Sequence, residues 1–182
     1  MIRAALVALV GFVPMLAEAR RSWRNERALR ALSAIEPPGD VYRAMQIAYP
    51  ACFVVMVGEA FVRDVPPGRS FAAGAVVFAA AKAIKYWAIA TLGDRWTFKV
   101  LVLPGYPLVT AGPYRLLRHP NYVGVVGELV GAALMAYAPL AGAASVLVFG
   151  VLLLARIRVE ERALLRHAVR SGKSVLGARE PH

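Results

Sequence analysis

Between two long apolar runs lies the stretch Gly112-Pro-Tyr-Arg-Leu-Leu-Arg-His-Pro-Asn-Tyr-Val-Gly124. It carries two arginines, a histidine and two tyrosines, which makes it a polar block at the mouth of an apolar helix and a candidate site. Because a proline restricts the residue before it, we expect His119 to be extended and Pro120 to open the next helix. The alternative interpretation is an ordinary interfacial belt of arginine and tyrosine.

The predicted start of this helix gathers His119, Asn121 and Tyr122. A helix N-terminus offers free N–H groups and a partial positive charge, which suit a carboxylate or another anionic part of a ligand. The sequence therefore predicts a binding site at this helix end.

The composition indicates an integral membrane protein. Of the 182 residues, 59% are hydrophobic, and the mean hydropathy is +0.55, values that an ordinary globular domain does not reach. The net charge of +11 does not indicate nucleic-acid binding, because the basic residues lie between apolar runs and form no face with interleaved aromatics. Cys52 is the single cysteine, which excludes an intrachain disulfide and a cysteine metal cluster and predicts a buried apolar side chain.

The apolar runs predict five membrane-spanning helices. Residues 1–19 end in Ala-Glu-Ala and imitate a signal peptide, but cleavage would leave the arginine-rich residues 20–30 on the translocated side, so we interpret the segment as retained. Residues 20–40 predict a short amphipathic helix and a turn. The other spans are expected near residues 41–62, 70–92, 122–138 and 140–155, and the last two should form a tight hairpin at Pro139.

The basic residues predict the orientation. Six Lys and Arg lie in residues 20–43, four in 95–118 and seven in 156–179, against two in the loop 63–69 and none at the Pro139 turn. With five spans, the positive-inside rule places the N-terminus outside and the C-terminus in the cytoplasm, as in a bacterial inner membrane. A soluble cofactor could then reach all three basic segments.

Two further sets of charged residues each allow more than one interpretation. Glu128 lies inside an expected span, where it could pair with Lys82 or Lys85 or contact a substrate, while the lysines are expected to snorkel towards the basic side. Arg156 and Glu160 are four residues apart and share a helix face, so they could simply bridge each other on a solvated helix. The chain shows no nucleotide-binding glycine motif, phosphate loop, nucleophile elbow or metal-ligand spacing.

Three blocks carry a family resemblance. They are Val109-Thr-x-Gly-Pro-Tyr114, Arg118-His-Pro-x-Tyr122-x-Gly124, and Arg156 with Glu160-Glu161 after the hairpin. In order and spacing they resemble the signature of the isoprenylcysteine carboxyl methyltransferase family, over about residues 93–162. The phospholipid N-methyltransferases and the sterol reductases share the general plan.

The resemblance implies an all-α, polytopic membrane enzyme with about five transmembrane helices. It implies one methyltransferase domain over residues 1–182, with three N-terminal spans in 1–92 and a cytoplasmic cofactor-binding, catalytic part in 93–182. The implied cofactor is S-adenosylmethionine, and the implied partners are membrane lipids and a lipophilic small-molecule or prenylated substrate from the bilayer.

The resemblance also implies roles for individual residues. Arg156 is expected to orient the substrate as the catalytic residue, and Glu160 to bind the cofactor. The segment Arg95-Trp-Thr97, Asn121 and Glu128 resemble the corresponding positions of bacterial family members that sit beside polyketide synthases. We expect Trp96 and Glu128 to contact the substrate. The departures Tyr106 and Lys99, where family members carry histidine and glutamine, bear on a protein substrate more than on the cofactor. The other implied cofactor contacts are Tyr106, Pro107, Leu108, Val109, Tyr114, His119, Pro120, Asn121 and Tyr122.

The predicted reaction is methylation of an oxygen, either a carboxylate or an acidic hydroxyl, on a lipophilic substrate. Such an oxygen is anionic at neutral pH, so an orienting arginine contributes more than a general base. The alternatives are an NADPH-dependent reductase of the sterol branch, a phospholipid N-methyltransferase, and a membrane chaperone or scaffold without a cofactor.

Overall fold

The computed structural model describes residues 1–104 and 106–170. Gly105 and the basic tail 171–182, which contributed to the charge count, lie outside the described residues. The described part is helical, and its sole β pairing is an isolated bridge between Ile35 and Val102. The helices are α1 (Ile2–Ala31), α2 (Tyr42–Arg63), α3 (Arg69–Leu92), η1 (Gly93–Arg95), η2 (Gly112–Arg115), α4 (Pro120–Ala136) and α5 (Pro139–Arg170).

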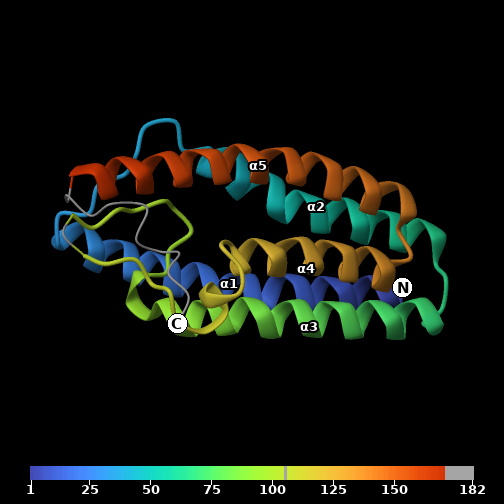
Figure 1. Ribbon diagram of the computed structural model, residues 1–182. Coiled ribbons are helices and arrows are strands. Elements are labelled where there is room, and N and C mark those ends of the chain that lie inside the picture. Colours follow the sequence, from blue (N-terminus) through green and yellow to red (C-terminus); the bar gives the residue numbers. More distant parts are fainter. Residues whose placement is uncertain (105, 171–182) are drawn as a thin grey trace.

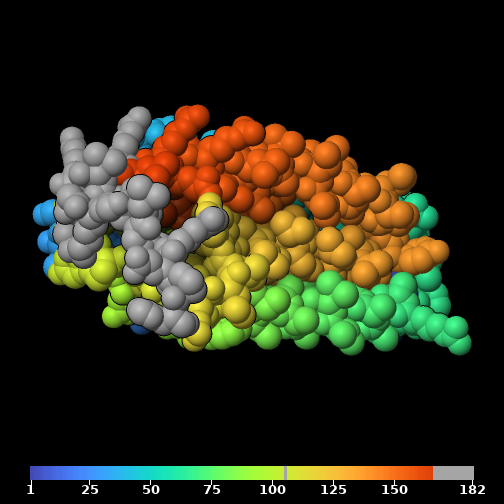
Figure 2. Space-filling model, viewed as in Figure 1, coloured from blue at the N-terminus to red at the C-terminus, as the bar shows by residue number. Residues whose placement is uncertain are grey.

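The five long helices form one elongated bundle (Figure 1). The N-terminus, the α2–α3 loop and the α4–α5 turn lie at one end, and the α1–α2 linker lies at the other. The segment with η2 lies closer to the middle of the bundle, where the shorter α4 begins. In the space-filling view, α3, α4 and α5 lie side by side along the visible face (Figure 2). Helices α1, α2, α3 and α5 are long and apolar enough to cross a membrane, whereas α4 is a shorter apolar helix of 17 residues.

The predicted boundaries agree with the structure in most places. Helices α2 and α3 follow the expected spans closely, and α4 and α5 form the expected hairpin. The prediction of a separate amphipathic helix after residue 19 is wrong, because α1 continues without a break to Ala31. Residues 20–31 contain no glycine or proline that would interrupt the apolar helix, so the two segments become one.

Small residues let α3 and α4 pack closely. A Cβ atom at Gly131 would lie 2.6 Å from the Phe78 nitrogen, and one at Gly124 would lie 2.8 Å from the Lys85 Cβ. Larger residues would therefore push the two helices apart. This close contact brings the polar side chains of α3 against those of α4.

Local contacts close the end of the bundle that holds the N-terminus. Arg3 is buried and donates hydrogen bonds to the Pro66 carbonyl at 2.6 Å and the Ser70 hydroxyl at 3.2 Å. Glu59 accepts a hydrogen bond from the Ala141 N–H at 2.6 Å and thereby satisfies a free N–H group at the start of α5. The candidate functional residues lie at the opposite end.

Candidate active site

Helix α4 begins at Pro120 as the sequence predicts, but His119 is not extended as expected, because its ψ lies outside the β region. Pro120 occupies the first turn, and His119 caps the helix with φ −130° and ψ 62°. The His119 carbonyl accepts the first helical hydrogen bonds, from the N–H groups of Tyr122 at 3.1 Å and Val123 at 3.3 Å. The His119 ring stacks on the Tyr122 ring, with 5.4 Å between centroids. Two predicted site residues are therefore held against each other at a helix N-terminus.

Tyr122 connects the start of α4 to α5. Its hydroxyl donates to Glu160 at 2.7 Å and accepts from the Nε of Arg156 at 3.3 Å. Among the described ion pairs, Arg156 and Glu160 do not bridge each other, because each has a different partner. The interpretation of this pair as a simple bridge on a solvated helix is therefore wrong.

Arg156 is buried by residues far away in the sequence. Its Nη1 pairs with Asp40, in the α1–α2 linker, and its Nη2 donates to the Phe98 carbonyl. Both the Arg156 and the Asp40 side chains are 4% exposed. We call Asp40, His119, Tyr122, Arg156 and Glu160 the Arg156 cluster.

Polar atoms at the α4 start lack partners within the described residues. His119 lies near two carboxylates, with its Nδ1 3.7 Å from Glu160 and its Nε2 3.5 Å from Glu161. Neither contact is a hydrogen bond, and the buried His119 Nε2 and Asn121 Oδ1 atoms have no hydrogen-bond partner. Because buried polar atoms are normally paired, these two atoms are available to hydrogen-bond a polar ligand.

Tyr114 contributes a hydroxyl close to the Arg156 cluster. It lies in η2, where Gly112 adopts a positive φ of 56°. Burial raises the pKa of the Tyr114 phenol, and the negative charge of Glu160 raises it further. The phenol therefore stays protonated at neutral pH and can act as a hydrogen-bond donor.

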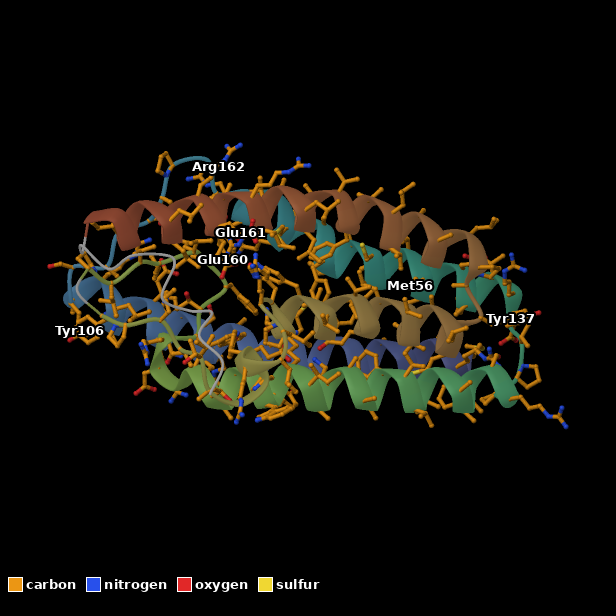
Figure 3. All side chains as sticks on the ribbon, viewed as in Figure 1. Met56, Tyr106, Tyr137, Glu160, Glu161 and Arg162 are labelled. Carbon is orange, nitrogen blue, oxygen red and sulfur yellow. The ribbon has the colours of Figure 1, made fainter. Side chains whose placement is uncertain are left out.

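The stretch from Tyr106 to Leu108 is exposed, and Val109 is half-buried. Tyr106 and Leu108 are 51% and 56% exposed, and the Pro107 carbonyl accepts a hydrogen bond from Arg95 at 2.9 Å. Tyr106 lies at the end of the bundle, away from Glu160 and Glu161 (Figure 3). The cofactor contacts implied for this stretch stay predictions.

Trp96 is a packing residue in the structure. Its side chain is buried and meets the Phe98 ring edge-on at a centroid distance of 5.2 Å. Its carbonyl accepts a hydrogen bond from Asn25 of α1 at 2.8 Å, and Ser22 accepts one from the Phe98 N–H. These contacts place the Phe98 carbonyl beside Arg156, while contact of Trp96 with substrate stays a prediction.

Glu128 belongs to a second charged group, the interior quartet of Glu18, Lys82, Lys85 and Glu128. Lys85 lies 2.6 Å from Glu18 and 3.3 Å from Glu128, and Lys82 lies 2.8 Å and 3.2 Å from the same carboxylates. Tyr49 donates a hydrogen bond to Glu128. The lysines therefore do not snorkel as expected, because carboxylates on α1 and α4 pair with them inside the bundle. Contact of Glu128 with substrate stays a prediction.

An apolar groove of about 450 Å³ lies elsewhere on the bundle. It is lined by α1 and α3 residues such as Val10, Pro14 and Phe78, with Met135 of α4. None of its lining residues belongs to the Arg156 cluster, so the groove by itself provides no route to Arg156.

Asp40 and Phe98 are the neighbours of Arg156 that the sequence prediction missed. Asp40 is 116 residues from Arg156, and a backbone carbonyl such as that of Phe98 leaves no mark in a sequence. The available signal was Asp40 itself, an acidic residue after Pro-Pro-Gly in an otherwise basic region.

Comparisons with known proteins agree with the family resemblance. A sequence model described as the isoprenylcysteine carboxyl methyltransferase (ICMT) family matches residues 73–166. The uncharacterized protein YpbQ of Bacillus subtilis is 30% identical over 165 residues, which cover 91% of this chain and 98% of that protein. An uncharacterized protein of Haemophilus influenzae is 27% identical over 144 residues, covering 79% of this chain and 84% of that protein. No solved structure matches the chain.

Proposed function

Because this chain belongs to the isoprenylcysteine carboxyl methyltransferase family, we propose that it is an S-adenosylmethionine-dependent O-methyltransferase with a lipophilic acceptor. The acceptor oxygen is a carboxylate, as in isoprenylcysteine carboxyl methylation, or an acidic hydroxyl. The observation that carries the proposal is the Arg156 cluster at the start of α4, together with the buried His119 Nε2 and the neighbouring Asn121 Oδ1, which lack hydrogen-bond partners among the described residues.

The residues present fit this cofactor. Glu160 is 29% exposed, so it can be reached from water and can accept from an ammonium group or ribose hydroxyls. The partial positive charge at the α4 N-terminus suits the carboxylate of the amino-acid moiety. His119 Nε2 and Asn121 Oδ1 supply further polar contacts, and Tyr114 can donate from its protonated phenol.

The chemistry requires little from the protein beyond positioning. When bound, S-adenosylmethionine supplies a methyl group on a sulfonium, so the new O–C bond forms as the S–C bond breaks. Arg156 orients the acceptor anion, and its burial strengthens that interaction by excluding water. An acceptor that is already ionised has no proton to lose, so a general base has no required role.

We infer that all five long helices cross the membrane, with the N-terminus outside. Residues 20–30 of α1 lie in the half of the bundle that also holds Glu160 of the Arg156 cluster (Figures 1 and 3), which supports a cytoplasmic position for both. The 17 residues of α4 span about 25 Å, slightly less than the hydrocarbon thickness, and flanking residues complete the crossing.

Calorimetry of the purified full-length protein tests the proposed cofactor. S-adenosylmethionine and its demethylated product should both bind, and NADPH should not. Binding of NADPH alone would indicate a reductase, and binding of none of the three would support a scaffold.

A matched pair of variants tests the proposed binding site. Glu160→Gln should weaken S-adenosylmethionine binding by about 1.5–3 kcal/mol, because it removes a charged hydrogen-bond acceptor. Glu161→Gln neutralises the adjacent, more exposed carboxylate and should leave the affinity nearly unchanged. Equal losses in both variants would mean that only the local negative charge matters, and the assignment to Glu160 would fail.

A further inference from the structure

We infer that Asp40 is a positioning residue that fixes the Arg156 guanidinium for the acceptor. This inference rests on the proposed function. Asp40 lies before the segment that matches the family, which begins at residue 73. It is nevertheless the carboxylate that pairs with Arg156, from a segment for which the sequence predicted only a turn.

Three donors hold the Asp40 carboxylate. Its Oδ1 accepts from the Tyr42 N–H at 3.1 Å and pairs with Arg156, and its Oδ2 accepts from the Val100 N–H at 3.2 Å. The first bond satisfies a free N–H group at the start of α2. The side chain is therefore bound to α2, to the segment after η1 and to α5 at the same time.

The backbone around Asp40 is fixed as well. Ile35 and Val102 exchange two backbone hydrogen bonds of 2.9 Å, which join the α1–α2 linker to the segment after η1. Lys99 of that segment pairs with Glu26 of α1 at 2.8 Å and lies 3.8 Å from Glu36. The linker that carries Asp40 is therefore held in place by backbone hydrogen bonds and ion pairs.

These contacts determine which N–H donors of the Arg156 guanidinium remain available to an acceptor. A guanidinium has five N–H donors, and Asp40, the Phe98 carbonyl and Tyr122 occupy one each. The remaining donors can meet an acceptor oxygen while the side chain stays fixed in orientation. Without Asp40, the guanidinium would keep its charge but lose its main fixed partner, so productive alignment would suffer more than cofactor binding.

The test compares Asp40→Asn with Glu36→Gln, a control in the same linker whose ion pairs within the described residues are with Arg30 and Lys99. Asparagine keeps an oxygen that can accept the Tyr42 N–H, so the start of α2 should survive. We expect Asp40→Asn to lower kcat/KM for the acceptor by about 10- to 100-fold, by analogy with the loss when the hydrogen-bond partner of a metal ligand is removed. S-adenosylmethionine affinity and the melting temperature should stay near those of Glu36→Gln.

A second readout does not depend on activity. Labelling with an arginine-specific dicarbonyl, followed by peptide mass spectrometry, reports the accessibility of Arg156 in the ligand-free protein, with the exposed Arg158 as internal standard. Arg156 should be protected in the parent and in Glu36→Gln and should react faster in Asp40→Asn. Equal protection in all three proteins would overturn the inference.

A double-mutant cycle with Arg156→Lys completes the test. If Asp40 acts through Arg156, then Asp40→Asn should add little to the loss already caused by Arg156→Lys. Losses that multiply would show that Asp40 acts independently, and a lower melting temperature with normal kcat/KM would make it purely structural. If the parent neither binds S-adenosylmethionine nor transfers methyl groups, the proposed function fails, while the labelling result still decides whether Asp40 fixes Arg156.

Discussion

The interior quartet and the Arg156 cluster are both buried, charged and assembled from distant segments, but they differ in how completely their charges are matched. In the quartet, two ammonium groups meet two carboxylates, and each lysine touches both. Two quartet oxygens without a hydrogen bond, Glu18 Oε2 and Glu128 Oε1, lie 2.6 Å and 3.2 Å from a lysine ammonium. In the Arg156 cluster, Arg156 is paired, whereas Glu160 is partly exposed. The buried His119 Nε2 and, beside the cluster, Asn121 Oδ1 have no hydrogen-bond partner among the described residues.

The difference shows which features distinguish a structural charge group from a binding site. A buried charge in a membrane helix suggests function by default, yet the quartet accounts for its own charges without a ligand. At the start of α4, by contrast, Asn121 Oδ1 has no described hydrogen-bond partner, and His119 Nε2 has only a 3.5 Å contact with Glu161. The buried charge of Glu128 is therefore weaker evidence of substrate contact than the unpaired atoms beside Tyr122.

The largest expected effect concerns membrane topology, because a reporter fusion scores either inside or outside the membrane. If the Arg156 cluster faces the cytoplasm, reporter fusions at the C-terminus and at Gly68 should score inside and outside, respectively, because the basic segments are held inside. The same side for both fusions would contradict the five-span arrangement and remove the cofactor's access to Glu160.

Breaking the quartet should cost stability. Lys85→Met leaves the Glu18 and Glu128 carboxylates with one lysine, so the free energy of unfolding should fall by about 3–5 kcal/mol in mixed micelles. Arg30→Gln, which removes an exposed partner, should stay near the parent. Glu128→Gln distinguishes the two interpretations of that residue, because normal stability with lost acceptor turnover would restore its predicted contact with substrate.

Breaking the Arg156 cluster should affect catalysis. Arg156→Ala should lower kcat/KM for the acceptor, with a loss of transition-state stabilisation of roughly 2–5 kcal/mol, because the orienting charge is buried. The affinity for the cofactor should stay the same. Acceptor kinetics and cofactor isotherms on the folded variant measure the two effects separately. Loss of cofactor binding with unchanged acceptor kinetics would reverse the assigned role.

The smallest expected effect concerns the acceptor chain. Each added methylene should raise kcat/KM by lowering the activation free energy by at most about 0.8 kcal/mol, the free energy of burying that group. The gain should stop when the chain fills its binding site. The measurement is turnover across a homologous series at equal bulk concentration. Equal turnover of a short, water-soluble acid and its long-chain analogue would argue against entry from the bilayer.

Local signals predicted the parts of the fold that depend on local physics. The proline after His119 fixed the start of α4, and the Pro139 break gave the hairpin. The apolar runs gave α2 and α3 nearly to the residue. The end of the first helix was missed because a change from apolar to basic residues alters the solvent preference of a helix without stopping it.

The partners of the buried charges could not be predicted, because they depend on packing between distant segments. Lys82 and Lys85 looked like snorkelling residues until close contact between α3 and α4 placed them beside Glu128, with Glu18 on their other side. Asp40 was missed for the same reason. The sequence identified His119, Tyr122, Arg156 and Glu160 as candidate functional residues. It did not identify Asp40, which holds Arg156 in place.

The depth of Arg156 along α5 has a consequence for how the enzyme would meet its substrate. Arg156 is 17 residues beyond Pro139, or about 25 Å along the helix axis, close to the thickness of the hydrocarbon layer. A reaction at this boundary lets the acceptor keep its chain among lipid tails while the cofactor stays in water. Neither molecule changes phase, so turnover would follow the acceptor's mole fraction in the bilayer and not its concentration in the suspension.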